Sequence, residues 1–243
     1  MNLFSNILIY GLLSGLATVA GIYLVLSKES WAKRNSVYLI SFSAGVLLAT
    51  AMGRLMPEAL SIQPNALLWF LISFIFFYIV EHGLILHSCN EHTHCEVHHP
   101  IDQIALIGMG LHSLMDGIII GVGFEVSPSL GIIATISVLL HRLPDGIAMT
   151  SILIHSHYKR SKTLLYTWIV AMAAPVGAIA SFFFLKNVSE GVLGIIVALA
   201  AGSFIYIAAS DLIPEIHRKS NFANIVLVLL GAAIPFIVKV FLP

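Results

Sequence analysis

Apolar runs as long as a membrane-crossing helix fill most of this 243-residue chain. A helix needs about 20 mostly apolar residues to cross a hydrocarbon core roughly 30 Å thick. The stretches that meet this requirement lie near residues 5–26, 35–56, 66–86, 102–124, 129–153, 163–185, 190–210 and 222–241. We therefore predict an all-α polytopic membrane protein with eight transmembrane helices, named span 1 to span 8 in chain order, in a single domain over residues 1–243.

The composition excludes several classes of protein. Hydrophobic residues make up 58% of the chain and charged residues 10%, which lies outside the range of soluble globular domains. The formal net charge is zero, so nothing indicates nucleic-acid binding, and no Gly-rich phosphate loop indicates ATP hydrolysis. No cationic stretch precedes span 1, which we interpret as a retained helix and not a signal peptide.

The basic residues predict how the chain crosses the membrane, because cytoplasmic loops carry an excess of Lys and Arg. The connections after spans 1, 5 and 7 hold Lys28, Lys33, Arg34, Lys159, Arg160, Lys162, Arg218 and Lys219, whereas the other side holds Arg54, Lys186 and Lys239. This bias puts both termini outside the cytoplasm. We expect an integral, multi-pass protein of the cell (inner) membrane.

Two sequence repeats indicate internal symmetry. AGVLLATAMGRLMPE (44–58) in span 2 matches AGSFIYIAASDLIPE (201–215) in span 7, and HSLMDGIIIGVGF (112–124) in span 4 matches HRLPDGIAMTSIL (141–153) in span 5. Each pair crosses the bilayer in opposite directions, as in an inverted-topology repeat. We predict that spans 1–3 and 6–8 are related in this way around spans 4 and 5, with chance similarity of apolar helices as the alternative.

The second repeat places two His/Asp pairs in the middle of the membrane. His112 with Asp116, and His141 with Asp145, are four residues apart, so each pair shares one helix face. Two imidazoles and two carboxylates suit a divalent transition ion, whose charge the aspartates balance. The alternative is a purely internal network in which Arg142 pairs with the aspartates and the histidines are hydrogen-bonded.

Pro144 is predicted to bend span 5 beside these residues. It lacks an N–H, so it should free the carbonyl of Leu140, four residues earlier, and that exposed carbonyl could serve an ion in transit.

A second group of metal-binding side chains lies between spans 3 and 4, in a loop over residues 87–101 that the predicted topology makes cytoplasmic. Its candidate ligands are His87, Cys89, His92, His94, Cys95, His98 and His99. Thiols are kept reduced in the cytoplasm, so we expect metal binding and no disulfide. We interpret the loop as a metal-collecting or feedback element, with an incidental linker as the alternative.

Three acidic residues lie near the ends of spans. Glu58 at the outer end of span 2, and Asp211 with Glu215 at the inner end of span 7, could attract cations to the two mouths of a pathway. Interfacial carboxylates that anchor helix ends are an equal alternative.

With these residues identified, the chain resembles the ZIP family of divalent metal transporters. The resemblance covers nearly the whole length and rests on the His-x-x-x-Asp-Gly motif of span 4 and the His-x-x-Pro-Asp-Gly motif of span 5. It implies that His112, Asp116, His141 and Asp145 bind the transported metal.

The resemblance also implies a departure from family members with two metals. Those members use the second residue of each motif and a carboxylate in span 6, but here the positions are Ser113 and Arg142, and span 6 has no carboxylate. We therefore hypothesise one metal site, in which Arg142 replaces the second ion by bridging to Asp116 or Asp145.

The resulting expectation is a transporter and not an enzyme, with no cofactor. It would move a divalent ion, Zn²⁺ before Fe²⁺ or Mn²⁺, into the cytoplasm by alternating access, with the metal and the lipid bilayer as partners. A homodimer is left open. An intramembrane zinc-dependent hydrolase and a membrane metal sensor are the rival interpretations, although the chain lacks an HExxH motif.

Overall fold

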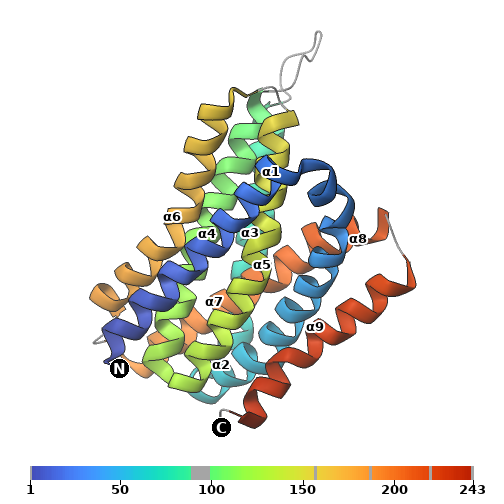
Figure 1. Ribbon diagram of the computed structural model, residues 1–243. Coiled ribbons are helices and arrows are strands. Elements are labelled where there is room, and N and C mark those ends of the chain that lie inside the picture. The colour runs from blue at the N-terminus through green and yellow to red at the C-terminus, as the bar shows by residue number, and fades with distance from the viewer. Residues whose placement is uncertain (1, 89–98, 156–157, 186–187, 219–220, 242–243) are drawn as a thin grey trace.

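The computed structural model describes residues 2–88, 99–155, 158–185, 188–218 and 221–241, and the described chain is helical without a strand (Figure 1). Its helices are α1 (Leu3–Thr50), η1 (Ala51–Leu55), α2 (Met56–Ile62), α3 (Ala66–Ser88), α4 (His99–Val126), α5 (Pro128–His155), α6 (Arg160–Leu185), α7 (Glu190–Ile207), η2 (Ala208–Leu212), α8 (Ile213–Arg218) and α9 (Phe222–Phe241). The segments η1 and η2 are π-helical.

Most of the predicted spans are helices of membrane-crossing length. Seven stretches of the described chain qualify: Leu3–Lys28 (span 1), Arg34–Ile62 (span 2), Leu106–Val126 (span 4), Pro128–Ile147 (span 5), Arg160–Leu185 (span 6), Glu190–Arg218 (span 7) and Phe222–Phe241 (span 8). Span 3 is helix α3, whose described apolar stretch, Ala66–Val80, is shorter. The predicted all-α polytopic membrane fold is therefore confirmed.

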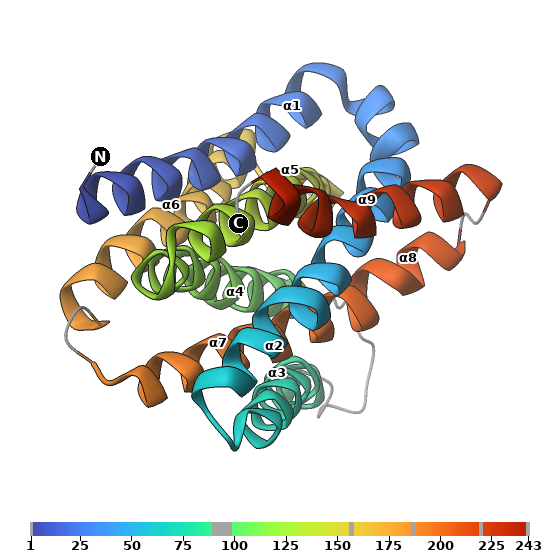
Figure 2. The ribbon, with the colours of Figure 1, turned by 90° about the horizontal axis from the view of Figure 1, so that it is seen from below.

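Spans 1 and 2 are joined differently from the prediction. In place of a loop, α1 continues from one span into the next, and only Lys28 leaves the helical conformation, with φ −141° and ψ 53°. Residues 28–34 contain neither Gly nor Pro, so local sequence does not end the helix. Figure 2 shows the change of direction between spans 1 and 2.

Spans 1, 4, 5 and 6, called here the site group, pack closely against one another through glycines. A Cβ atom at Gly117 in span 4 would collide with the carbonyl oxygen of Ala174 in span 6. One at Gly146 in span 5 would collide with the carbonyl oxygen of Thr18 in span 1. Such approaches need a residue without a side chain, so the two glycines that follow the aspartates fix how spans 4 and 5 lie.

Spans 2, 3, 7 and 8, called here the flanking group, pack in the same manner. Gly45 in span 2 lies against the carbonyl of Val228 in span 8, and Gly202 in span 7 against that of Phe70 in span 3. Each described glycine that lies close to another helix has its nearest neighbouring atoms in the same group: glycines of the site group contact the site group, and glycines of the flanking group contact the flanking group. The end-on view shows the two groups side by side (Figure 2).

The contacts of the two halves correspond. In the predicted repeat, spans 1, 2, 3 and 4 correspond to spans 6, 7, 8 and 5, in that order. The contact between spans 4 and 6 then has its counterpart in the contact between spans 5 and 1. Likewise, the contact between spans 2 and 8 has its counterpart in the contact between spans 7 and 3. The π-helical segments Ala51–Leu55 and Ala208–Leu212 also occupy equal positions in the matched sequences 44–58 and 201–215.

Candidate metal centre

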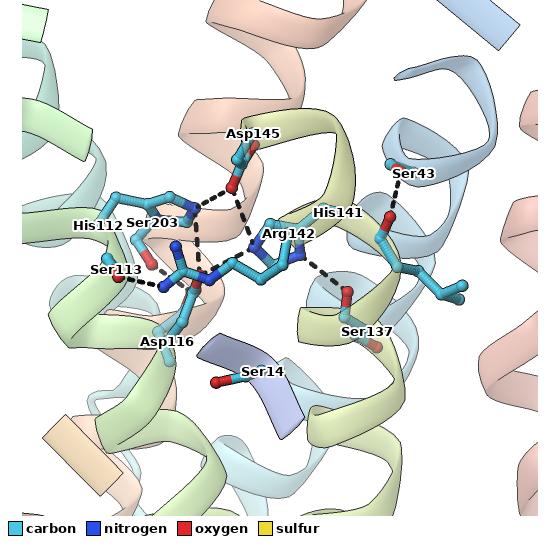
Figure 3. A network of polar contacts seen from close by, with 12 residues as sticks. Ser14, Ser43, His112, Ser113, Asp116, Ser137, His141, Arg142, Asp145 and Ser203 are labelled. Carbon is cyan, nitrogen blue, oxygen red and sulfur yellow. Dashed lines mark hydrogen bonds and ion pairs between the residues drawn. The ribbon is translucent and has the colours of Figure 1, made fainter. Parts of the chain in front are cut away.

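The two His/Asp pairs meet between helices α4 and α5, near the middle of each helix (Figure 3). His112 and Asp116 project from α4, and His141 and Asp145 from α5. One possible ligand atom from each lies within 4.8 Å of the others, and all four side chains are buried. Among the described residues this is the only such group of His, Cys, Asp and Glu side chains.

The spacing of the ligand atoms suits a tetrahedral ion. Asp116 Oδ2 lies 2.9 Å from His141 Nε2 and 3.4 Å from His112 Nε2. Asp145 Oδ2 lies 3.8 Å from His112 Nε2 and 4.0 Å from His141 Nε2. Ligands about 2.0–2.1 Å from a tetrahedral zinc ion lie about 3.3 Å apart. The observed distances bracket that value, so small side-chain movements would complete the geometry.

Several polar atoms of this cluster form no hydrogen bond within the described chain. They are Nδ1 and Nε2 of His112, Oδ1 of Asp116 and Oδ2 of Asp145, and each is inaccessible to solvent. A buried polar atom without a partner costs about 1–3 kcal/mol. A bound cation would provide the missing partner for the acceptor atoms that face it.

The ring of His141 is held with its Nε2 facing the cluster. Its Nδ1 lies 2.8 Å from the carbonyl oxygen of Ser137, one turn earlier in α5. A carbonyl only accepts hydrogen bonds, so Nδ1 carries a hydrogen. Nε2 faces the cluster and lies at hydrogen-bond distance, 2.9 Å, from Asp116 Oδ2. A metal ion bound at Nε2 would take the place of the hydrogen in that contact. A fixed outer hydrogen bond of this kind is typical of metal-binding histidines.

Arg142 is fully buried beside the cluster and pairs with Asp116. Its Nε lies 3.1 Å from Asp116 Oδ2, and its terminal nitrogen donates to Ser113 Oγ at 2.5 Å. Ser113 in turn donates to the carbonyl of Val170 in span 6, also at 2.5 Å. Arg142 is predicted to bridge to Asp116 or Asp145, and its ion pair is with Asp116. Arg142 thus links span 5 to span 4 (Figure 3), and Ser113 extends the link to span 6.

The carbonyl that Pro144 leaves without its helical donor is not available to an ion, contrary to the prediction. Ser43 of span 2 donates to the carbonyl oxygen of Leu140 at 2.8 Å. Burial explains this outcome, because a buried carbonyl without a donor is costly. The proline revealed which carbonyl was freed, but sequence alone could not identify Ser43 as its partner.

Sequence reasoning also missed residues of span 7 at the cluster. The ring of Phe204 packs edge-on against His141, with centroids 5.6 Å apart. Ser203, the neighbouring residue of span 7, is fully buried and is drawn with the cluster in the close-up view (Figure 3), and its hydroxyl donates to Ala200 of its own helix. Both residues belong to the apolar repeat over residues 201–215. Nothing in its sequence pattern indicates that the segment borders a metal site.

The predicted mouth carboxylates are not members of this cluster. Glu58 is half-buried on α2, Asp211 is exposed on η2, and Glu215 on α8 forms an exposed ion pair with Arg218 at 3.4 Å. No described acidic group near these positions forms a further metal-sized cluster. Of the predicted loop ligands, His87 lies within α3, and His99 is the first residue of α4. The others lie outside the described residues: Cys89, His92, His94, Cys95 and His98.

Comparisons with known proteins agree with this arrangement. A family model described as ZIP Zinc transporter matches residues 86–239, which include both His/Asp pairs. The chain is 33% identical over 121 residues to zinc transporter zipt-7.1 of Caenorhabditis briggsae, covering 49% of this chain and 31% of that protein. It is 32% identical over 119 residues to human zinc transporter ZIP6, covering 49% and 16%.

A further relative, zinc transporter ZIP9 of Micropogonias undulatus, is 26% identical over 155 residues, covering 55% of this chain and half of that protein. The chain thus spans half or less of the length of the curated relatives it matches. The family match itself covers more than half of the chain and contains the cluster between α4 and α5. The chain belongs to the ZIP family of zinc transporters.

Proposed function

We propose that this protein transports a divalent transition metal, Zn²⁺ before Fe²⁺ or Mn²⁺, across the membrane through the His112, Asp116, His141 and Asp145 site. The observation that carries the proposal is a buried set of two imidazoles and two carboxylates midway along two membrane-crossing helices. Buried ionisable groups at that depth are costly and are usually functional. The names of the relatives support zinc as the first candidate.

The site binds one ion in this proposal. Two aspartates and Arg142 give the empty site a net charge of −1, and one divalent ion converts it to +1. A second divalent ion would have to share the site with the Arg142 guanidinium, which is fully buried and pairs with Asp116. Arg142 therefore takes the electrostatic role of a second metal.

An inverted repeat gives the site its two access routes. The exchanged glycine contacts and the two equally placed π-helical segments support this symmetry. In alternating access, one packed group moves against the other, so that the site opens first to one side of the membrane and then to the other. The site group carries all four ligands, so its motion relative to the flanking group carries the ion.

The described conformation supports access from one end of the bundle. Both termini and the α4–α5 turn lie at one end, called here the terminal end (Figure 1). Between the site and this end, spans 2, 4, 5 and 7 meet in an apolar contact that includes Leu55, Ile119, Val122, Leu130 and Val197. These side chains are buried, so the site is closed toward the terminal end.

The residual exposure of the site lies on the other side. His112 and Asp145 are 4% and 7% exposed, against 0% for Asp116 and 1% for His141. Because α4 runs toward the terminal end and α5 away from it, His112 and Asp145 are the two ligands farther from that end. The basic loop residues favour a cytoplasmic location for the open side. We infer that metal leaves to the cytoplasm, with both termini outside.

Metal uptake into proteoliposomes tests the proposal. Initial rates for Zn²⁺, Fe²⁺, Mn²⁺ and Cd²⁺ should saturate with concentration and should be lost in Asp116→Ala and His141→Ala. Thr135→Ala is the matched control, because Thr135 is a buried residue of α5 whose hydroxyl bonds only to Gly131 of its own helix. Uptake that survives both site substitutions would refute this pathway.

The rival interpretations differ in what the site must do. A catalytic zinc ion keeps an open position for water, usually beside three protein ligands, whereas this cluster offers four. A sensor would use the loop over residues 87–101 and should lose its response when residues 87–99 are deleted. A transporter should keep its basal flux after that deletion.

A further inference from the structure

Two hydroxyl groups of span 2 contact the turn of span 5 that carries His141. Ser43 donates to the carbonyl of Leu140, the residue before His141. Thr50 lies 2.5 Å from the hydroxyl of Ser137, whose carbonyl holds His141 Nδ1. Span 2 is thus bonded to Ser137 and Leu140, the first and last residues of the turn that precedes His141.

In the hydrogen bond between Thr50 and Ser137, the donor can be identified from the other hydrogen bond that Ser137 makes. The hydroxyl hydrogen of Ser137 is used on the carbonyl of Ile133, at 2.8 Å. Thr50 must therefore donate to Ser137 Oγ, since a hydroxyl has one hydrogen to give. All of the hydroxyl groups involved are buried, with Ser43 and Ser137 1% exposed and Thr50 fully buried.

These bonds join the flanking group to the site group. Closest packing through glycines occurs within each group, so we place the relative motion at the boundary between the groups, which the contact of spans 2 and 5 crosses. A hydrogen bond across that boundary holds the groups in one relative position and must break when they move.

The other half of the repeat cannot form the equivalent bonds. In the alignment of residues 44–58 with 201–215, Thr50 corresponds to Ile207, and Ser43 immediately precedes the match opposite Ala200. Neither Ala200 nor Ile207 carries a hydroxyl. If the two halves exchange conformations during transport, the contact between spans 7 and 4 that replaces this one lacks both bonds.

We propose that Ser43 and Thr50 are positioning residues that clamp the His141 turn of span 5 against span 2 and stabilise the conformation closed at the terminal end. The inference rests on the proposed alternating-access function. In that function, the two hydroxyl groups stabilise the resting state. They touch neither metal nor ligand atoms, and they act through Leu140 and Ser137.

Cysteine labelling measures this directly. In a background with Cys89→Ser and Cys95→Ser, Val197→Cys places a thiol in the apolar contact at the terminal end. The full-length protein in proteoliposomes is treated with a membrane-impermeant maleimide added to the terminal side. In Ser43→Ala/Thr50→Val, the labelling rate should rise about fivefold or more, as expected when two hydrogen bonds favouring the closed state are removed.

Matched variants separate a clamp from general loosening. Ser41→Ala removes a buried hydroxyl of the same helix that donates only to its own turn, at Val37, and should leave labelling unchanged. Ser43→Thr/Thr50→Ser keeps both hydroxyls and should label as slowly as the unsubstituted background. The single variants Ser43→Ala and Thr50→Val should give intermediate rates, which keeps the test valid if the double variant folds poorly.

The outcomes distinguish this inference from the transport proposal. Unchanged labelling in Ser43→Ala/Thr50→Val, or an equal rise in Ser41→Ala, overturns the clamp. If the unmodified protein takes up no metal, the transport proposal fails whatever the labelling shows. If it takes up metal and labelling is unchanged, only the clamp fails.

Discussion

Arg142 Nε lies 3.1 Å from Asp116 Oδ2, with both side chains fully buried, and the same carboxylate oxygen lies 2.9 Å from His141 Nε2. One oxygen thus contacts both a fixed cation and a candidate metal-ligand histidine. The positive charge beside Asp116 reduces the attraction of the site for divalent ions. It also keeps Asp116 balanced when no ion is bound.

Replacing Arg142 should make the protein depend on metal for its stability. In Arg142→Ala the buried Asp116 loses its counter-ion, and breaking a buried pair in this way costs about 3–5 kcal/mol. A bound zinc ion would restore the balance. We expect a lower melting temperature without metal in detergent, and a larger rise on adding Zn²⁺ than in the unmodified protein.

The comparison with Arg142→Lys tests the role of charge. Lysine keeps the positive charge but loses the bond to Ser113, so its response to zinc should lie nearer the unmodified protein. An equal zinc-induced rise in all three proteins would contradict the assignment of Arg142 as a replacement for a second ion.

Ser113 should matter through its two hydrogen bonds. Ser113→Ala leaves the terminal nitrogen of Arg142 without its Ser113 acceptor and removes the hydroxyl donor to the Val170 carbonyl, which should lower the free energy of unfolding by about 1–3 kcal/mol. Ser203→Ala is the matched control, because that buried hydroxyl donates only to Ala200 of its own helix. Thermal unfolding of the two variants should separate them, and equal melting temperatures would show that the Ser113 bridge is not stabilising.

Gly117 should tolerate no side chain, whereas Gly108 on the same helix should. A Cβ at Gly117 would collide with the Ala174 carbonyl, but one at Gly108 has no atom within 4 Å. Gly117→Ala should cost about 1–3 kcal/mol through overpacking. Gly108→Ala should be neutral or stabilising, by up to about 1 kcal/mol from helix propensity. Similar stabilities for the two variants would contradict the close packing of spans 4 and 6.

Much of the fold could be predicted because the bilayer sets the length of a crossing helix. Predicted and observed bounds of span 8 agree, 222–241 against Phe222–Phe241, and α3 and α6 differ from prediction by a few residues. The turn at Lys28 could not be predicted as a kink in a continuous helix, because no Gly or Pro marks it. The π-helical segments left no trace in the apolar pattern.

The four candidate ligands could be found from sequence because polar residues at i and i+4 are conspicuous in an apolar span. Their outer partners could not. From sequence, either Asp116 or Asp145 could be the partner of Arg142. Only the packing of α4 on α5 selects Asp116. The partner of the Leu140 carbonyl is Ser43, which is distant in sequence and has no motif of its own.

The number of zinc ions bound per chain tests the central claim most directly. The measurement needs a protein in which the loop ligands His87, Cys89, His92, His94, Cys95, His98 and His99 are replaced by serine, so that only the intramembrane site can bind. Equilibrium titration in detergent should then give one Zn²⁺ per chain, and none after His112→Ala/His141→Ala is added. Two ions per chain, or one ion retained without the two histidines, would contradict a single site built from His112, Asp116, His141 and Asp145.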